Sequence, residues 1–68
     1  MKLSARNQLV GKIIEIKEGP VNAAVKIEIS KDIVISSTIS MDAVKELGLT
    51  VGAEATAVIK ATSVMIMA

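Results

Sequence analysis

The sequence predicts an all-β fold with one short helix, in which five strands curl into a small Greek-key barrel. Short runs of alternating apolar and polar residues recur along the chain, as in strands with one buried face. Only residues 40–48 show the cap and the terminal glycine of a helix instead. The 68 residues contain no linker or low-complexity tract, so residues 1–68 form a single domain.

The first predicted strand covers residues 8–17 and ends at the turn of residues 18–20. Its alternation of apolar and polar side chains slips between Ile13 and Ile14, close to Gly11. A slip of this kind beside a glycine predicts a β-bulge or a sharp bend in the strand.

The second predicted strand, residues 21–30, has the clearest period of two. Its apolar face is expected to point inward and comprises Val21, Ala23, Val25, Ile27 and Ile29. A hairpin at Lys31-Asp32 leads to a third strand at residues 33–39. That strand places Ile33, Ile35 and Ile39 on one face, and it becomes polar on both faces at residues 36–38.

A short helix is predicted over Met41–Leu47. Ser40 precedes it as the N-cap, Asp42 suits the positive end of the helix dipole, and Gly48 follows as the terminating glycine. The apolar side chains of this helix are expected to form a buried stripe, namely Met41, Val44 and Leu47.

A turn at Val51-Gly52 leads into a fourth strand, residues 53–60, whose inward face is mostly alanine. These small side chains allow another element to approach closely. The last predicted strand, residues 63–67, is apolar on both faces. A strand of this kind is buried on both sides, so we expect one side to meet a neighbouring copy of the chain.

Three strands, a helix and two further strands in so short a chain suit a five-stranded barrel of the OB type. A two-layer α+β sheet is the alternative. A chain of this size buries only about 60% of the surface that it exposes when unfolded. Because 51% of the residues are hydrophobic and 22% are charged, we expect self-association to cover part of the apolar surface.

The composition excludes several classes of function. The chain has no His, Cys, Trp, Tyr or Phe, and its net charge is +1. An enzyme would then need a Ser–Lys pair or paired carboxylates, and no motif for either is present, so we predict no enzyme, cofactor or metal site. OB modules that bind nucleic acid commonly stack bases on aromatic rings, and nucleic-acid-binding proteins usually show a basic face. The lack of aromatic residues and the net charge of +1 therefore disfavour nucleic-acid binding. No apolar run is long enough for a signal peptide or a membrane span, so a cytoplasmic protein without membrane contact is expected.

Hydrogen-bond donors are concentrated at the start of the chain. Ser4, Arg6 and Asn7 offer a hydroxyl, a guanidinium and an amide beside backbone N–H groups, which suits an oxyanion. The alternative is an ordinary solvated polar arm. Lys60 would join this site only if the fold or a neighbouring copy places it beside Arg6, with the N–H groups of Ala61 and Thr62; otherwise it is a solvated charge at a strand end.

Two further sets of polar groups have both a structural and a binding interpretation. Residues 19–22 form a turn, but around a symmetry axis between copies their N–H groups and the Asn22 amide would bind a second anion. The hydroxyls of residues 36–40 are either further donors or an edge-strand surface with a helix cap.

The opening Ser4-Ala5-Arg6-Asn7-Gln8-Leu9-Val10-Gly11-Lys12-Ile13 resembles the signature of the molbindins, the Mop-type molybdate-binding proteins built from a TOBE module. The same module occurs in regulatory domains of molybdate transporters and in molybdate-responsive regulators. The resemblance covers essentially the whole chain. It continues through residues 37–40, 47–49 and 51–52 and the closing residues 57–66.

This resemblance implies an OB-like barrel that assembles as a hexamer, a trimer of dimers. It implies storage of molybdate or tungstate in the cell at sites between subunits. The family's interface site maps onto Ser4, Ala5 and Arg6 of one subunit and Lys60 and Ala61 of the adjoining one. A second site near the threefold axis is assigned to Gly19, Val21 and Asn22.

One departure from the family pattern is Ala43, where some members carry a serine just after the helix start. Two other functions stay open beside molybdate binding: an OB-type nucleic-acid-binding module and a purely structural oligomerisation domain.

Overall fold

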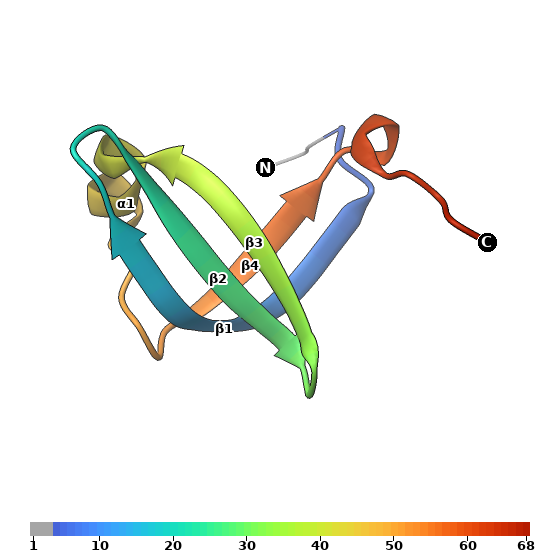
Figure 1. Cartoon of the computed structure of the whole chain (residues 1–68), viewed down its shortest axis with the longest axis horizontal. Helices are drawn as coiled ribbons and strands as arrows, with labels where there is room; N and C mark the ends of the chain where they lie inside the picture. The colour runs from blue at the N-terminus through green and yellow to red at the C-terminus, as the bar shows by residue number, and fades with distance from the viewer. Residues whose placement is uncertain (1–3) are drawn as a thin grey trace.

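The computed structural model describes residues 4–68. Its strands are β1 (Asn7–Glu18), β2 (Asn22–Ser30), β3 (Ile33–Ser40) and β4 (Glu54–Ile59). The short helix α1 (Met41–Leu47) lies between β3 and β4, and a 3₁₀ turn, η1 (Ala61–Ser63), follows β4. The strands form one antiparallel sheet in the order β3-β2-β1-β4, which curls into an open half-barrel (Figure 1).

An all-β fold with one short helix was therefore predicted correctly, but the sheet has four strands. The predicted fifth strand at residues 63–67 is wrong for the described chain: Ser63 ends η1, and residues 64–68 have no regular secondary structure. Met65, Ile66 and Met67 are 93%, 91% and 98% exposed. A strand that is apolar on both faces needs neighbours on both sides, and one copy of the chain does not provide them.

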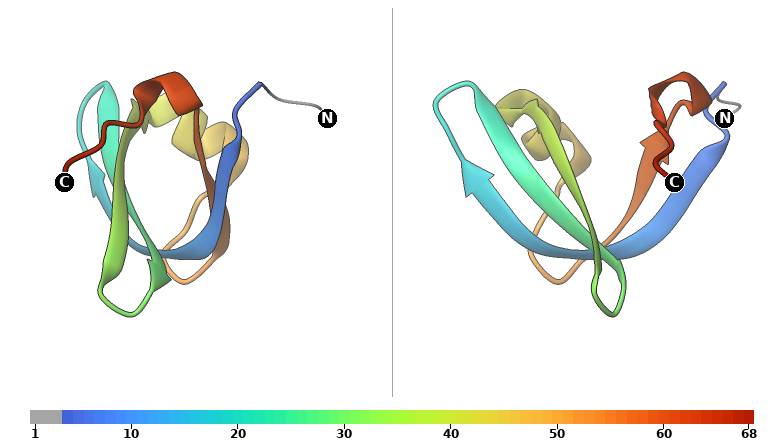
Figure 2. Two further views of the ribbon diagram at one scale, coloured as in Figure 1. Left: turned by 90° about the vertical axis from the view of Figure 1, so that its right-hand side faces the viewer. Right: turned by 45° about the vertical axis from the view of Figure 1, so that its right-hand side comes forward.

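β1 is the strand that bends the sheet. Its first half pairs with β4, from Asn7↔Ile59 to Lys12↔Glu54, and its second half pairs with β2. The register with β2 shifts between Ile13 and Glu15, which confirms the predicted irregularity. Figure 2 shows the resulting two arms, one formed with β2 and β3 and the other with β4.

Gly11 permits this bend because it has no side chain. A Cβ atom at Gly11 would lie 2.7 Å from Ile27 Cγ2 and even closer to the backbone oxygen of Glu28. Real Cβ atoms essentially never approach other atoms so closely, so any other residue would push β1 and β2 apart. Glycine at this point allows one strand to serve both arms.

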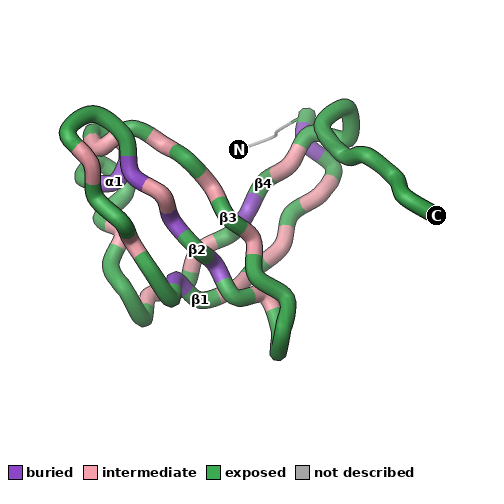
Figure 3. Tube along the Cα trace, viewed as in Figure 1, coloured by how far each residue is buried: buried purple, intermediate pink, exposed green. Residues whose placement is uncertain are grey.

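The core lies mainly in the arm that contains β2 (Figure 3). Its buried apolar side chains come from β1, β2, α1 and β4: Ile13, Ala23, Val25, Ile27, Val44 and Ala57. Three of the five residues predicted to face inward along the second strand are buried, namely Ala23, Val25 and Ile27. Val21 is not, because it lies in the turn before β2 and is 69% exposed.

The helix begins and ends at the predicted residues. The Ala43 N–H donates a 3.0 Å hydrogen bond to Ser40 Oγ, and Gly48 adopts the left-handed conformation with φ 63°. The predicted buried stripe is only partly correct: Val44 is buried and Met41 half-buried, but Leu47 is 68% exposed. Leu47 lies in the last turn, where it borders an apolar groove rather than the closed core.

Ile33, which was expected on the inward face of β3, is 54% exposed because it adjoins the β2–β3 hairpin. Within residues 4–68, the structure has no helix with both the length and the hydropathy that a bilayer crossing requires.

Candidate functional site

The two predicted anion-binding segments meet at one end of the β1–β4 ribbon. Asn7, the first residue of β1, pairs with Ile59, the last residue of β4. Residues 4–6 therefore precede this pair, and Lys60 and Ala61 follow it directly. One chain thus brings together two segments that are more than fifty residues apart in the sequence.

Two amide side chains fix the opening segment. Asn7 Nδ2 donates to the backbone oxygen of Ile59 at 3.3 Å, and Gln8 Nε2 donates to the backbone oxygen of Ala5 at 3.5 Å. Ala5 is buried, whereas Ser4 and Arg6 on either side of it are exposed. From the sequence, Asn7 is predicted only as one of the hydrogen-bond donors. The structure shows that its side chain joins the two segments, a role that depends on the pairing of β1 with β4.

Arg6 and Lys60 place two positive charges at this end. Arg6 precedes Asn7 and Lys60 follows Ile59, so each adjoins the terminal pair of β1 and β4, and both residues are exposed. Like charges at one end of a strand pair repel each other. A dianion between the two cations would replace this repulsion with two attractive interactions.

The backbone adds donors beside Lys60. In η1 the Ser63 N–H donates to the Lys60 oxygen at 2.8 Å, and the Val64 N–H donates to the Ala61 oxygen at 3.2 Å. Within the described part of the chain, the N–H groups of Ala61 and Thr62 have no backbone carbonyl partner. These two groups are available to a ligand or to water.

Acidic residues are absent from both segments of this end. The first carboxylate along the sequence is Glu15 and the last is Glu54, so residues 1–14 and 55–68 contain only neutral and positively charged side chains. A site without carboxylates favours anions that accept hydrogen bonds and donate none.

The second predicted anion-binding set lies far from the first, in the turn between β1 and β2. The Gly19 N–H already donates to the Asn22 oxygen at 2.9 Å, and the Val21 oxygen accepts from the Met41 N–H at 2.8 Å. A Cβ on Gly19 would lie 2.7 Å from the Asn22 oxygen, so glycine is required for the shape of this turn. The exposed Asn22 side chain is the group here that is available for binding.

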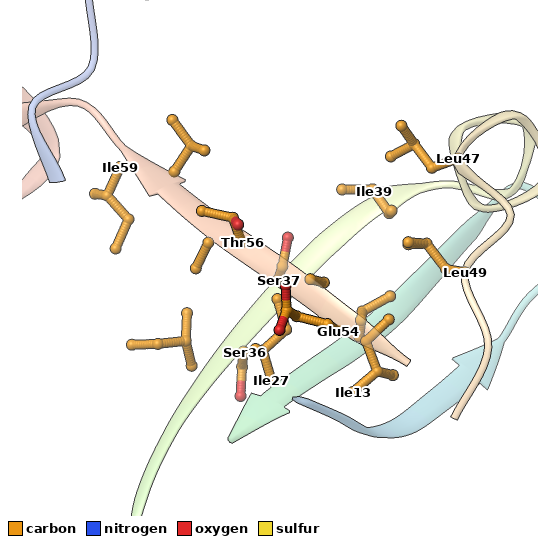
Figure 4. Close-up of a pocket in the computed structure, with 15 residues that line it drawn as sticks. Ile13, Ile27, Ser36, Ser37, Ile39, Leu47, Leu49, Glu54, Thr56 and Ile59 are labelled. Carbon is orange, nitrogen blue, oxygen red and sulfur yellow. The ribbon is translucent and has the colours of Figure 1, made fainter. Parts of the chain in front are cut away.

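The polar groups of residues 36–40 divide between two roles. Ser40 Oγ caps α1 by accepting from the Ala43 N–H, and this contact uses the backbone of the alanine that stands where some molbindins have serine. Ser36 and Ser37 line an apolar groove between β3 and β4 (Figure 4). No local pattern in the sequence predicts this groove, because it depends on how far the two ends of the sheet lie apart.

Comparison with known proteins agrees with the resemblance in the opening and closing motifs. A family model described as the TOBE domain matches residues 3–66. The chain is 62% identical over 66 residues to a probable molybdenum-pterin-binding protein of Haemophilus influenzae, covering 97% of this chain and 96% of the relative.

Two solved structures have the same fold. MopII from Clostridium pasteurianum matches with a TM-score of 0.90 and 54% identity over 98% of this chain and all of that chain. A molybdate-binding protein from Sporomusa ovata matches with a TM-score of 0.93 and 34% identity over the full length of both chains. The likeness to MopII confirms the OB-like architecture, with four strands in the described chain.

Proposed function

The chain belongs to the TOBE-domain family, and on this premise we propose that it binds molybdate, and the similar tungstate, for storage or homeostasis in the cytoplasm. The relative from Sporomusa ovata is described as a molybdate-binding protein, and the Haemophilus relative as a probable molybdenum-pterin-binding protein. Both descriptions name a binding protein rather than an enzyme.

One observation carries this proposal beyond the family likeness. The pairing of Asn7 with Ile59 brings Arg6 and Lys60 to one end of the β1–β4 ribbon, and the adjoining segments contain no carboxylate. Ser4 and the N–H groups of Ala61 and Thr62 supply further donors beside the two cations. The oxyanion is held by Ser4, Ala5 and Arg6 together with Lys60 and Ala61.

This donor set suits molybdate in particular. Molybdate is a tetrahedral dianion whose oxygens only accept hydrogen bonds at neutral pH. Monohydrogen phosphate carries a proton that would face donors alone, and a polar group left unpaired in this way costs about 1–3 kcal/mol. Sulfate has the same charge but is smaller, so the size of the closed site must discriminate between the two dianions.

The name of the Haemophilus relative also mentions a pterin. Proteins commonly hold planar heterocycles against aromatic rings, and this chain has no Phe, Tyr or Trp. The cations and N–H donors at the end of the β1–β4 ribbon suit the oxyanion instead.

In the proposed assembly, a hexamer built as a trimer of dimers, this end of the β1–β4 ribbon in one copy faces the same end in an adjoining copy. Residues 4–6 of one copy and Lys60 and Ala61 of the other then enclose one anion. The support is that Ser4, Arg6 and Lys60 are all exposed in one copy, so a second copy is needed to exclude water from the anion. The turn containing Gly19, Val21 and Asn22 is proposed as a second site at the threefold axis, where the exposed Asn22 amide would donate.

Isothermal titration of molybdate into the purified protein tests the binding directly, with sulfate and phosphate as controls. Saturable heat with molybdate and tungstate, but with neither control, supports the proposal and counts the sites for each chain. Absence of saturable heat from a folded oligomer would contradict it and favour a structural oligomerisation domain. Retention of RNA at low salt would favour the nucleic-acid-binding alternative.

Mixing two inactive variants tests whether the segments act between copies. Arg6→Ala and Lys60→Ala chains are unfolded together, refolded and titrated with molybdate. If each site takes one segment from each of two copies, about a quarter of the sites in a random mixture regain both side chains. If both segments of a site come from one chain, the mixture binds no better than either variant alone.

A further inference from the structure

Asn7 supplies the side-chain hydrogen bond that joins the two predicted anion-binding segments. Its Nδ2 donates to the backbone oxygen of Ile59, 52 positions further along the sequence, whereas the Gln8 amide bonds back to Ala5 within its own segment. The third side-chain hydrogen bond of residues 4–68 is the Ser40 cap of α1. Among the described residues, Asn7 is therefore the one side chain that hydrogen-bonds to the backbone of a different strand.

This hydrogen bond holds the peptide group that leads into Lys60. The Ile59 oxygen belongs to the planar trans peptide unit that includes the Lys60 nitrogen, so fixing this oxygen also fixes the direction of the Lys60 N–H. On the other side of Lys60, its own backbone oxygen accepts from the Ser63 N–H at 2.8 Å. Both peptide groups that flank the Lys60 side chain are thus held, one by Asn7 and one by η1.

Few other contacts hold this segment in one copy. Residues 60–68 are all exposed, and Asn7↔Ile59 is the terminal pair of the ladder between β1 and β4. A terminal pair has a neighbouring pair on one side only, and such ends open more readily than the inner pairs of a sheet. The charges of Arg6 and Lys60 also repel each other at this end. The hydrogen bond from the half-buried Asn7 opposes both effects.

The Asn7 amide is poorly suited to contact the anion itself. One of its N–H groups donates to Ile59, and its oxygen accepts hydrogen bonds, so this oxygen would repel the oxygens of an oxyanion. Lys60 and the N–H groups of Ala61 and Thr62, by contrast, are donors and lie directly after the peptide group that Asn7 holds. Asn7 therefore acts on the anion through these groups.

We propose that Asn7 is a positioning residue of the anion site, whose amide holds Lys60 and Ala61 beside residues 4–6 of the same chain before the anion arrives. If Lys60 is in place in only a fraction of the chains, the apparent affinity falls by that fraction. The inference rests on the proposed function for its ligand. It is the same whether the segments around one anion belong to one copy or to two, because Lys60 has to be held in either arrangement.

Calorimetric titration of molybdate into paired variants separates positioning from direct contact. Asn7→Leu keeps the branched shape of the side chain and removes the amide donor. It should lower molybdate affinity about fivefold to tenfold, as expected for one lost hydrogen bond, both in the otherwise unmodified chain and in the Lys45→Ala chain, which lacks a charge on α1. In the Lys60→Ala chain the group to be positioned is missing, so Asn7→Leu should lower affinity by at most about twofold further.

Three results of this titration would contradict the positioning role. An equal loss in all three chains would overturn it, because Asn7 would then contribute independently of Lys60, as a direct ligand does. Unchanged affinity after Asn7→Leu would overturn it too, while molybdate binding by the unmodified chain would leave the proposed function standing. Absence of binding by the unmodified chain would overturn the proposed function itself, and the positioning role with it.

Amide hydrogen exchange in the ligand-free protein tests the holding of Lys60 without any anion. The Ser63 N–H, which donates to the Lys60 oxygen, should exchange several-fold faster after Asn7→Leu, because the segment opens more often. The Met41 N–H is the matched control, since it donates to the Val21 oxygen at the same 2.8 Å distance but begins α1. Equal acceleration of both groups would mean that Asn7 only stabilises the fold. That result, or unchanged exchange at Ser63, would overturn the proposal.

Discussion

The two arms of the sheet on either side of the β1 bend differ in how they are stabilised. In the arm with β2, β3 and α1, a single copy buries most of the core, including Val25 and Ile27. In the arm with β4 and η1, a single copy leaves residues 65–67 and the donor residues exposed. We therefore expect the first arm to carry the stability of the folded chain and the second to carry ligand binding and association. Substitutions in the two arms should affect different measurements.

The largest effect is expected where the arms meet. Ile13 is fully buried at the bend and is the largest side chain with no exposure. Ile13→Ala should lower the free energy of unfolding by about 2–5 kcal/mol, through lost burial and the cavity that remains. Urea denaturation followed by circular dichroism measures this loss. A change below about 1 kcal/mol would show that stability does not depend on this junction.

The next effect concerns association and belongs to the exposed arm alone. Met65→Asp or Met67→Asp should dissociate the oligomer, since each removes about 1.5–3 kcal/mol of apolar burial and introduces a charge. Light scattering after size exclusion measures the assembly mass. Val34→Asp is the matched control because Val34 is an exposed apolar residue of β3 that does not line the groove between β3 and β4. An unchanged mass for both methionine variants would show that residues 65–67 are not at an interface.

Substitutions at the end of the β1–β4 ribbon should lower molybdate affinity while leaving the stability of the fold nearly unchanged. Arg6→Ala or Lys60→Ala should each remove about 1.5–3 kcal/mol of binding, roughly a 10- to 100-fold loss of molybdate affinity, because a hydrogen bond to a charged group is lost. The free energy of unfolding should change by less than about 0.5 kcal/mol, since both side chains are exposed.

Lys45→Ala removes the same charge from the other arm and is the control for a general electrostatic effect. If affinity and stability fall together in the Arg6 and Lys60 variants, direct contact with the anion is the wrong explanation. Titration calorimetry and denaturation of the same preparations give both quantities.

A smaller effect is expected at the helix cap. Ser40→Ala removes the acceptor of the Ala43 N–H and should cost about 1 kcal/mol of stability. Molybdate affinity should not change, because Ser40 ends β3 and caps α1, whereas Arg6 and Lys60 adjoin the terminal pair of β1 and β4. A thermal melt beside a calorimetric titration tests both parts, and lost affinity with unchanged melting would assign the hydroxyl to a ligand instead.

The smallest effect is expected at the ion pair between β1 and β2. Lys26 Nζ lies 3.5 Å from Glu15 Oε2, and the two side chains are 46% and 51% exposed. Lys26→Ala should therefore change the free energy of unfolding by less than about 1 kcal/mol, and high salt should reduce the difference further. A larger loss of the free energy of unfolding, measured by urea denaturation, would mean that the ion pair fixes the register of β1 and β2 beside the bulge.

The sequence by itself determined the local elements. The period of two defined β2 and β4 to within one residue, the slip beside Gly11 predicted the irregularity in β1, and Ser40 and Gly48 bounded the helix. These features follow from interactions between residues close together in the chain, namely alternation, capping and turn geometry. The donor motif of residues 4–6 was visible for the same reason.

Long-range pairing in the folded chain fixes which distant groups meet and which apolar residues stay exposed. The pairing of Asn7 with Ile59 brings Arg6 and Lys60 to the same end of the sheet, and no local pattern contains that register. Residues 63–67 have the sequence of a strand, yet a strand forms only where an edge is available, and residues 65–67 are exposed in the described chain. Local propensity selects the conformation of a segment, and long-range pairing decides whether and where that segment finds its partner.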